Sequence, residues 1–351
     1  MSVFLKDYTE IEKILNENGA KKPFLCCGKS FQKTEHFNFL KKFDVVVFDS
    51  IRPNPRYEDM ITGAELFKRE GCDFMIAAGG GSPMDTAKMI RLMATNDISK
   101  ALSEPMQNNP IKALFIPTTA GTGSEATKSS VFYLNEVDKF SVANYDFIPD
   151  YILFDEELLK TVPEYQRKCT CLDALCHAIE SYSSKKATDE SKGYAKKAIS
   201  LFLENKDSYL KNEPSGNRGM LMASYYAGKA IHITGTTAPH AMCYTITMNC
   251  HTAHGHSVAA CLYELWKYAL EGNYPKDVFC DLASVMGADT AEEGYEVFKN
   301  IYDGLNLEQP RLSENRLDEI VSKVNMAKLS TNPVSLTAED VKEVYRRVLC
   351  E

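Results

Sequence analysis

The sequence predicts an α/β domain followed by an all-α domain, and three observations support this prediction. Short apolar runs alternate with helical patterns through the first half of the chain. Two glycine-rich turns follow strand candidates, as they do at the carboxyl edge of a doubly wound parallel sheet. After about residue 161, strand patterns nearly vanish and helical periodicity continues. We therefore expect an α/β domain over residues 1–161 and an α-helical domain over residues 162–351.

The strand candidates of the first half are unbroken apolar runs, which are typical of parallel strands buried on both faces. They lie at residues 23–27, 43–49, 72–81 and 112–119. Helical patterns between them lie at residues 31–42, 56–71 and 83–95. The last of these helices is expected to begin at Pro83, because proline favours the first helical position. Residues 128–154 contain further short runs that we expect to form additional strands.

The second half is predicted to be helical throughout. Within residues 171–182, one face of a helix carries Leu172, Leu175, Ile179 and Tyr182, as expected of a helix packed on one side. Further helical patterns lie at residues 188–211, 215–233, 255–271, 290–303 and 337–349.

The composition is that of an ordinary globular protein, with 44% hydrophobic and 25% charged residues among 351. The net charge of −8 and the lack of a basic block argue against a nucleic-acid or anionic-membrane partner. No apolar run reaches the 18 residues of a membrane span, and the N-terminus lacks the features of a signal peptide. The 11 cysteines are irregularly spaced and too sparse for a disulfide scaffold, so we expect a cytoplasmic protein.

The turn GGGS at residues 79–82 stands between a strand candidate and a helix candidate. Glycines let the backbone approach a phosphate closely, and a helix N-terminus supplies free N–H groups. The turn matches neither GxGxxG nor GxxxxGK[ST], so a plain strand–helix turn with Ser82 as the N-cap is the alternative. Asp85 follows in the first turn, where it could complete the cap or touch a ligand.

A second turn, PTTAGTGSE at residues 117–125, also follows a strand candidate. Two such turns at strand ends in one open sheet indicate a single long, phosphate-bearing ligand. The pair therefore favours a dinucleotide over two unrelated turns.

A metal site is indicated by one carboxylate and several histidines. Asp173 and His177 are four residues apart on a predicted helix and project from one face. Four of the seven histidines fall between residues 240 and 256, at His240, His251, His254 and His256. One carboxylate with three imidazoles suits a divalent ion such as Fe²⁺ or Zn²⁺. The spacing alone does not select which histidines would bind, and ordinary surface or core histidines are the alternative.

Together these motifs resemble the iron-containing (group III) alcohol dehydrogenase family. The resemblance is carried by GGGSPMDTAK (79–88), PTTAGTGSE (117–125), DALCHAIES (173–181), PHAM (239–242) and AHGH (253–256). Their order and spacing match across about residues 45–260, and as a set they are highly specific. The resemblance implies a Rossmann-like dinucleotide-binding domain, a helical domain that binds metal and substrate, and a metal in the cleft between them.

The resemblance also implies roles for individual residues. The positions that match the family's metal ligands are Asp173, His177, His240 and His254. The pyrophosphate would lie at Gly80, Gly81 and Ser82, with Asp85 nearby. Further cofactor-binding positions are matched by Asn54, Thr118, Thr119, Thr122 and Lys139.

Three segments resemble, more narrowly, the phosphonoacetaldehyde reductase branch of this family. They are LDALCHAIESYSS, GKAIHITGTTAPHAMCYTIT and HGHSVAACL. This branch reduces phosphonoacetaldehyde to 2-hydroxyethylphosphonate. We therefore expect metal-dependent, NAD(P)H-linked reduction of a small anionic aldehyde to a primary alcohol, with another small alcohol or aldehyde as the alternative substrate. The expected partners are this substrate and further copies of the chain in a homo-oligomer.

Two positions depart from the family pattern. Many members carry a histidine one turn after the ligand that corresponds to His240, and this chain has Tyr244 there. Many NAD-using members carry an acid after the second strand, whereas the strand at residues 23–27 runs into Gly28-Lys29-Ser30. Without that acid a 2′-phosphate is not repelled, so we expect NADPH to be accepted.

The mechanism implied by the resemblance uses the metal as a Lewis acid and the nicotinamide as the hydride donor. His256 is the candidate catalytic residue, as a proton relay or a contact for the anionic end of the substrate. A dehydroquinate synthase-like lyase and a non-catalytic nucleotide or metal sensor are the competing function classes. The motifs DALCHAIES and PHAM favour the dehydrogenase over both.

Overall fold

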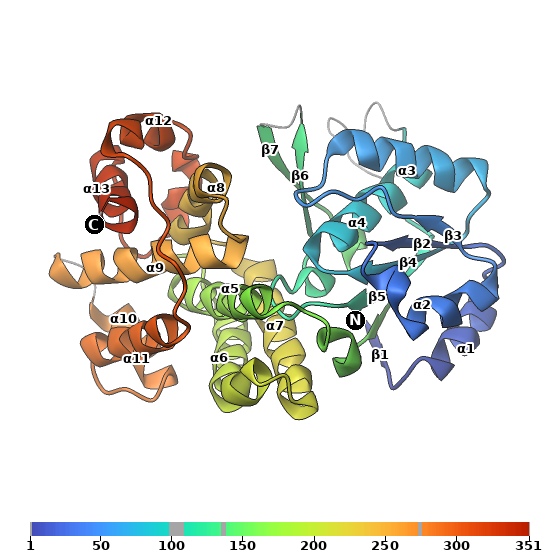
Figure 1. The fold of residues 1–351 in the computed structure, drawn as a ribbon, viewed down its shortest axis with the longest axis horizontal. Coiled ribbons are helices and arrows are strands. Elements are labelled where there is room, and N and C mark those ends of the chain that lie inside the picture. Colours follow the sequence, from blue (N-terminus) through green and yellow to red (C-terminus); the bar gives the residue numbers. More distant parts are fainter. Residues whose placement is uncertain (1, 98–108, 135–137, 273–275, 351) are drawn as a thin grey trace. The chain divides into compact units, whose positions relative to one another are not determined.

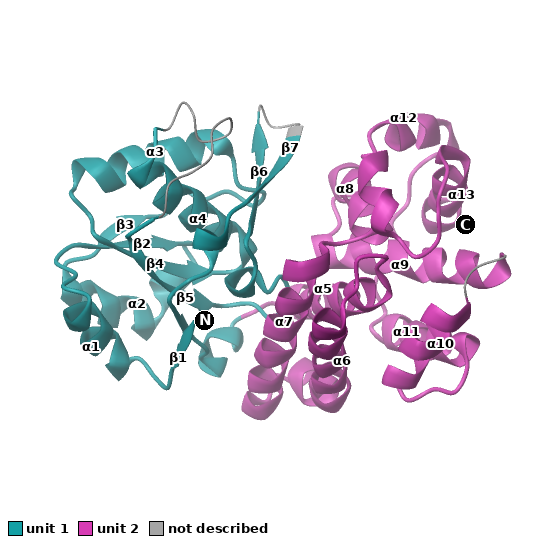
Figure 2. Cartoon of the chain, turned by 180° about the vertical axis from the view of Figure 1, so that it is seen from behind, with its two compact units in different colours: residues 1–161 teal, residues 162–351 magenta. Residues whose placement is uncertain are grey.

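The computed structural model describes residues 2–97, 109–134, 138–272 and 276–350. The chain divides into two compact units, Met1–Thr161 and Val162–Glu351, which Figure 2 shows in separate colours. The first unit is built on a parallel sheet, and the second consists of helices (Figure 1). These features confirm the predicted fold class.

A six-stranded parallel sheet forms the centre of the first unit, in the order β1-β8-β5-β4-β2-β3. Its strands are β1 (Val3–Leu5), β2 (Pro23–Cys27), β3 (Val46–Phe48), β4 (Phe74–Gly79), β5 (Lys112–Pro117) and β8 (Tyr151–Leu153). Every residue of β2 and β4 is buried, as expected of central strands covered on both faces. β4 pairs with β5 so that Gly79 lies opposite Pro117, and both glycine-rich turns therefore begin at the same edge.

Helices cover both faces of this sheet (Figure 1). They are α1 (Thr9–Glu17), α2 (Glu35–Leu40), α3 (Tyr57–Arg69) and α4 (Gly81–Thr95). Met60, Phe67 and Ile90 of α3 and α4 pack on Met75 and Phe115 of the sheet in one buried apolar cluster. Of these elements, β1 and α1 were not predicted from the sequence.

The additional strands expected over residues 128–154 belong to two different sheets. β6 (Ser129–Leu134) and β7 (Asp138–Ala143) form a separate antiparallel hairpin. β8 instead joins the main sheet between β1 and β5. The β6–β7 hairpin matters for the site because β6 packs against α4.

The start of α4 differs from the prediction. The helix begins at Gly81 with Gly80 at the N-cap, not at Pro83, and Ser82 makes no capping bond. Pro83 is tolerated at the third helical position because the first N–H groups of a helix have no acceptor within it. The first bond of the helix is accordingly donated by the Met84 N–H to the Gly80 carbonyl, at 3.4 Å.

The second unit consists of helices around a central one, α5. The helices are α5 (Glu164–Ser183), α6 (Asp189–Leu210), α7 (Pro214–Thr234), α8 (Ala238–Cys250), α9 (His254–Glu271), α10 (Lys276–Val285), α11 (Ala291–Gly304), α12 (Leu317–Ser322) and α13 (Ala338–Leu349). α5 packs against α6, α7 and α9. It is therefore buried around most of its circumference; Leu172, Leu175 and Ile179 of the predicted apolar face are buried and Tyr182 is half-buried. None of the described helices is both long and apolar enough to cross a lipid bilayer.

Candidate metal and cofactor sites

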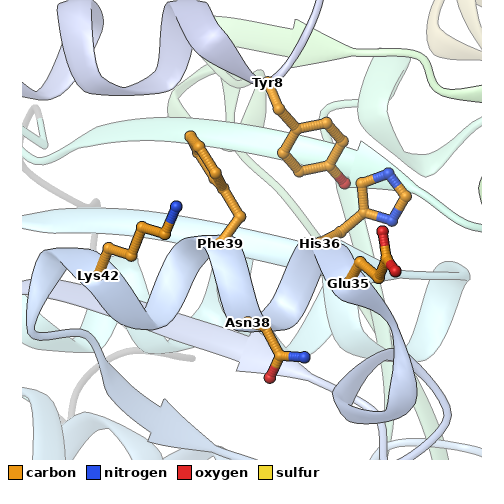
Figure 3. Close-up of a pocket in the computed structure, with 6 residues that line it drawn as sticks. All are labelled: Tyr8, Glu35, His36, Asn38, Phe39 and Lys42. Carbon is orange, nitrogen blue, oxygen red and sulfur yellow. The ribbon is translucent and has the colours of Figure 1, made fainter.

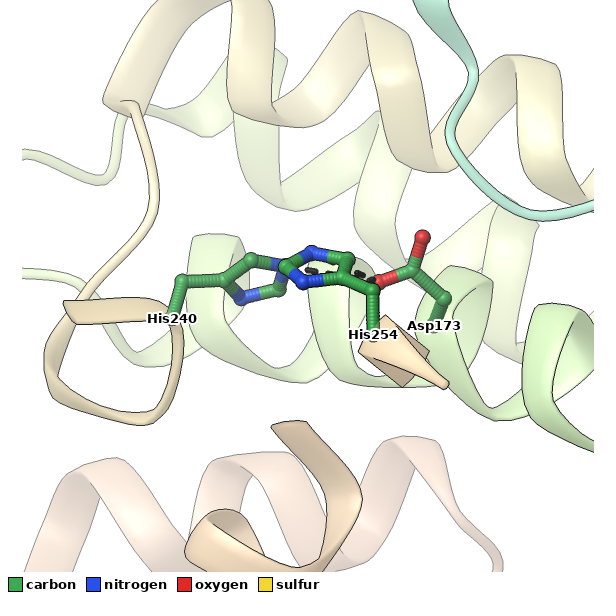
Figure 4. A group of neighbouring side chains, drawn as sticks. All are labelled: Asp173, His240 and His254. Carbon is green, nitrogen blue, oxygen red and sulfur yellow. Dashed lines mark ion pairs between the residues drawn. The ribbon is translucent and has the colours of Figure 1, made fainter. Parts of the chain in front are cut away.

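Three of the expected metal ligands meet in the second unit, each from a different helix (Figure 4). Asp173 lies on α5, His240 in the first turn of α8, and His254 is the first residue of α9. The Nε2 atoms of His240 and His254 lie 3.4 Å and 3.7 Å from Oδ1 of Asp173. All three candidate ligand atoms fall within 4.8 Å of one another.

His177, the fourth expected ligand, lies beside this cluster. It stands one turn after Asp173 on α5, and its Nε2 is 3.9 Å from the same Oδ1 atom. Its ring stacks on that of His240, with 4.4 Å between the centroids. The three-residue group does not include it. His177 as a metal ligand therefore stays a prediction.

Glu180 determines which ring nitrogen of His240 carries the hydrogen. Nδ1 of His240 pairs with Oε1 of Glu180, and an ionised carboxylate only accepts hydrogen bonds. The other carboxylate oxygen accepts the backbone N–H of Thr237 at 2.7 Å and its hydroxyl at 2.9 Å. A neutral His240 thus carries its hydrogen on Nδ1 and presents a lone pair on Nε2 toward Asp173.

The corresponding partner of His254 is Cys243. The Cys243 thiol donates to the carbonyl oxygen of His240 at 3.3 Å, which uses its single hydrogen. Nδ1 of His254 lies 3.6 Å from the same sulfur, which is then the acceptor. His254 therefore also presents the Nε2 lone pair to the cluster.

The cluster thus consists of three electron-pair donors that face one another. Oδ1 of Asp173 and Nε2 of His240 are buried, and neither has a hydrogen-bond partner among the residues that the structure describes. A buried acceptor without a donor is costly unless a cation neutralises it. For metal–ligand bonds of about 2.1 Å, a tetrahedral site needs ligands about 3.4 Å apart, close to the distances here. The residues present therefore fit a divalent metal ion.

The pKa shifts of the clustered residues also fit a site for a cation. Burial alone would raise the pKa of Asp173, but the surrounding imidazoles hold it well below its usual range. Burial would lower the pKa of His240, but Glu180 and Asp173 raise it to about 9. The raised pKa of His240 reports the negative potential of Glu180 and Asp173 at its ring, where a proton and a metal ion compete for Nε2.

The side of the cluster at His254 is open. The His254 side chain is 37% exposed, against 4% for Asp173. Tyr244, which occupies the position where many family members carry a histidine, stacks on the His254 ring at 5.5 Å. His254 is therefore the ligand candidate of the cluster that reaches solvent, beside the Tyr244 ring.

His256, the candidate catalytic residue, is held outside this cluster. It follows His254 by two residues on α9, so the two side chains project in nearly opposite directions. The Tyr165 hydroxyl accepts the Ala253 N–H at 3.0 Å and forms a hydrogen bond with Nδ1 of His256 at 3.2 Å. His256 is buried, and burial lowers its pKa to about 4. A catalytic role for His256 stays a prediction.

In the first unit the two glycine-rich turns are packed together. A Cβ added to Gly80 would lie 2.9 Å from Oγ1 of Thr119, and one added to Gly81 would lie 3.0 Å from Cγ2 of Thr122. The Thr118 N–H donates to the Gly79 carbonyl at 2.9 Å. Side chains at Gly80 and Gly81 would fill this cradle. Without them, the N–H groups that begin α4 remain open to a pyrophosphate.

Asp85 ties α4 to the second turn. Its carboxylate accepts the Ser124 hydroxyl at 2.7 Å, the Val131 N–H at 3.0 Å and the Lys88 ammonium at 3.3 Å. Lys88 is completely buried and also donates to the Ser129 carbonyl at 2.7 Å. Asp85 therefore supports the cradle through these contacts, and direct contact with the cofactor stays a prediction.

Asn54 lies beside the β6–β7 hairpin, and Lys139 is part of β7. Asn54 has a left-handed backbone with φ of 60°, and the next residue, Pro55, accepts the Tyr133 N–H at 2.8 Å. Tyr133 pairs with Lys139 across the hairpin. The structure therefore brings these two expected cofactor positions to the same hairpin.

Glu180, Cys243 and Lys88 are candidate site residues that the sequence analysis did not assign. Glu180 is seven residues after Asp173, a two-turn spacing that places both carboxylates on one side of α5. That spacing could have revealed Glu180 from the sequence. The contacts of Cys243 and Lys88 join separate elements and leave no pattern in the sequence.

A depression of about 540 Å³ on the first unit is lined by Tyr8, Glu35, His36, Asn38, Phe39 and Lys42 (Figure 3). The Tyr8 and His36 rings lie 4.2 Å apart, and Nε2 of His36 pairs with Asp155 at 2.8 Å. Burial and the Asp155 charge raise the pKa of the Tyr8 hydroxyl. This depression contains neither the expected metal ligands nor the glycine-rich turns, so we do not assign it to catalysis.

Comparisons with known proteins were consistent along the whole chain. The family described as "Iron-containing alcohol dehydrogenase" matches residues 4–156, and "Fe-containing alcohol dehydrogenase family, C-terminal" matches residues 168–349. A choline dehydrogenase of Bacillus subtilis (strain 168) is 34% identical over 87% of this chain and 80% of that protein. A 1,3-propanediol dehydrogenase of Klebsiella pneumoniae is 31% identical over 77% of this chain and 73% of that protein. A solved structure of a 1,3-propanediol oxidoreductase has a TM-score of 0.89 at 25% identity, covering 99% of this chain and 98% of that one.

Proposed function

The chain belongs to the iron-containing alcohol dehydrogenase family, and we propose that it is an aldehyde reductase that acts on phosphonoacetaldehyde. Members of this family are oxidoreductases that use a nicotinamide cofactor and a divalent metal. The proposed reaction consumes phosphonoacetaldehyde, NAD(P)H and one proton, and yields 2-hydroxyethylphosphonate and NAD(P)⁺.

The observation that carries the chemistry is the cluster of Asp173, His240 and His254. Its three candidate ligand atoms lie within 4.8 Å of one another, with Asp173 and His240 buried and His254 partly exposed. When bound, the divalent ion stabilises negative charge on the carbonyl oxygen and the nicotinamide supplies the hydride. A lyase with the same fold would need this metal too, so the cluster supports the metal requirement and the family supports the redox reaction.

The substrate proposal is supported by sequence segments in the second unit. The segments at residues 172–184, 228–247 and 254–262 resemble the phosphonoacetaldehyde reductase branch. They contain all three clustered ligands and Glu180. The related choline dehydrogenase is named for a cationic alcohol and the related 1,3-propanediol dehydrogenase for a neutral one. Substrate charge therefore changes within this fold and has to be tested for this chain.

The chain's own residues supply binding and orientation. Asp173, His240 and His254 would hold the ion, and the exposed side of His254 admits the aldehyde. The N–H groups of Gly81 and Ser82 at the start of α4 would bind the cofactor pyrophosphate.

A proton for the alkoxide is proposed to come through His256. Tyr165 is 43% exposed and its hydroxyl forms a hydrogen bond with Nδ1 of His256. Together the two side chains form a hydrogen-bonded path from solvent into the second unit.

NADPH is proposed as an accepted cofactor. β2 ends at Cys27, and Lys29 and Ser30 follow as exposed residues beyond its carboxyl end. A lysine and a hydroxyl suit a 2′-phosphate, and residues 28–30 include no acid; Asp49, which follows the neighbouring strand β3, accepts a hydrogen bond from Gln32.

The test is an aldehyde panel with the full-length, metal-loaded protein. Phosphonoacetaldehyde, acetaldehyde, 3-hydroxypropionaldehyde and betaine aldehyde would each be assayed with NADH and with NADPH, by the fall in nicotinamide absorbance. We expect stoichiometric cofactor oxidation and a kcat/KM for phosphonoacetaldehyde at least tenfold above the others. Equal or higher efficiency with an uncharged or cationic aldehyde would contradict the substrate. Absence of cofactor oxidation with every aldehyde would favour a lyase or a sensor.

A further inference from the structure

Glu180 is a buried carboxylate whose contacts all lead to the metal cluster. It is 1% exposed and stands two turns after Asp173 on α5. One oxygen pairs with Nδ1 of His240, and the other accepts both the N–H and the hydroxyl of Thr237. Within the described ranges, its ion-pair partner is His240.

We propose that Glu180 is a positioning residue of the metal site, which orients His240 through Nδ1 and thereby determines the affinity and geometry of metal binding. The inference rests on the proposed metal-dependent function. It assigns Glu180 an effect on metal binding through its hydrogen bond to the ligand His240. Partners of this kind fix the orientation of a ligating histidine and increase its basicity.

The first part of the argument is orientation. Thr237 directly precedes α8, and His240 is the third residue of that helix. The same carboxylate therefore holds the start of the helix and the ring it presents. Glu180 accepts hydrogen bonds from both Thr237 and His240. A rotation of the imidazole about its side-chain bonds, or a shift of the start of α8, would therefore break a buried hydrogen bond.

The second part is charge. Asp173 and Glu180 together carry two negative charges at a site with no contacting lysine or arginine among the described ion pairs. A divalent ion would balance these two charges. A glutamine at position 180 would keep the shape, remove one charge and leave a single acceptor oxygen where Glu180 has one for Nδ1 of His240 and one for the Thr237 N–H.

The experiment compares metal binding by full-length variants stripped of metal and titrated with Zn²⁺ or Co²⁺ against a chromogenic chelator. We expect Glu180→Gln to weaken Zn²⁺ binding by about 10–100-fold and to alter the visible spectrum of the Co²⁺ form. Glu180→Asp, which restores the charge at shorter reach, should recover part of the affinity. The matched control is Glu293→Gln, which removes a carboxylate that also accepts backbone N–H groups, from Asp289 and Thr290, in the same unit.

A second variant distinguishes the contact of Glu180 with the His240 ring from its contacts with Thr237 at the start of α8. Thr237→Val removes the hydroxyl bond but leaves the carboxylate on His240, so the Zn²⁺ affinity should fall by less than about threefold. If Thr237→Val weakens binding as much as Glu180→Gln, the effect belongs to the helix start and the inference is wrong. Unchanged affinity and an unchanged Co²⁺ spectrum in Glu180→Gln would also overturn it.

The same titration keeps the two proposals apart. A parent chain that binds no metal tightly, or that binds it and reduces no aldehyde, contradicts the proposed function. A parent chain that binds metal and reduces aldehyde, alongside a Glu180→Gln variant with equal metal affinity, contradicts only the role of Glu180.

Discussion

The ammonium of Lys88 donates to the Ser129 carbonyl at 2.7 Å, which joins α4 to the start of β6 by a buried charge. Lys88 also donates to the Ser124 hydroxyl at 2.7 Å. Burial lowers the pKa of Lys88, whereas Asp85 and Glu125 act to raise it. The packing of the two glycine-rich turns therefore depends on a charged group that never meets solvent.

Replacing Lys88 with methionine should destabilise the first unit. The variant leaves Asp85, Ser124 and Ser129 with unmet polar atoms in a dry environment. We expect the free energy of unfolding, measured with urea, to fall by about 3–5 kcal/mol. The control is Lys112→Met, which removes an exposed pair with Asp150 and should cost less than about 1 kcal/mol. An equal loss in both variants would contradict the structural importance of the buried ammonium.

Glu125 should make stability depend on pH. Burial raises the pKa of its carboxyl from 4.5 to about 7. Between these values the unfolded chain ionises Glu125 while the folded chain keeps it protonated. The contribution of Glu125 to the free energy of unfolding is therefore fully present below about pH 4.5 and is lost as the pH rises through about 7.

The measurement compares urea unfolding of the parent with Glu125→Gln from pH 5 to pH 8. We expect the variant to gain on the parent with rising pH, by up to about 3 kcal/mol. Glu157→Gln, at an exposed glutamate, should show no such trend. A constant difference between Glu125→Gln and the parent would show that the carboxyl does not change its protonation on folding.

Removing a clustered ligand should remove metal and activity together. Asp173→Asn or His254→Ala deletes one of three converging donors, so metal content measured by atomic absorption should fall from about one ion per chain to near zero. His251→Asn is the control, because His251 is exposed and asparagine tolerates its left-handed backbone with φ of 55°. Full aldehyde reduction by a metal-free variant would disprove the proposed mechanism.

Lys29 should contribute to NADPH binding and not to NADH binding. Loss of a cation near the 2′-phosphate should raise the KM for NADPH by about tenfold in Lys29→Ala, equivalent to about 1.4 kcal/mol. The KM for NADH should stay within twofold. Lys33→Ala removes a nearby exposed lysine and serves as the control for general charge effects. Equal effects on both cofactors would place Lys29 away from the 2′ position.

Much of the candidate site could be predicted because its residues are close in sequence. The turn at residues 79–82 lies between β4 and α4, as expected from three glycines after an apolar run. Asp173 and His177 share a face of α5 because a spacing of four residues is one helical turn. The start of α4 was misplaced by two residues, because proline is compatible with several positions in the first turn.

Other parts could not be predicted, because they depend on contacts between distant elements. Asp85 appears from the sequence to be a residue of the phosphate turn, yet its oxygens bind Ser124 and Val131 across the first unit. α8 was missed as a helix, although it carries His240. Its apolar residues are spread around the helix without an amphipathic period, since most of the helix is buried.

The sequence by itself therefore determined the fold class, the two glycine-rich turns and the residues able to bind a metal, because local spacing and residue chemistry are enough for these. Only the tertiary structure decided that Asp173, His240 and His254 meet within 4.8 Å and that Glu180 and Cys243 turn both Nε2 lone pairs inward. The physical reason is that ligand geometry arises from the packing of α5, α8 and α9. That packing depends on side chains up to about 80 positions apart, which no local pattern records.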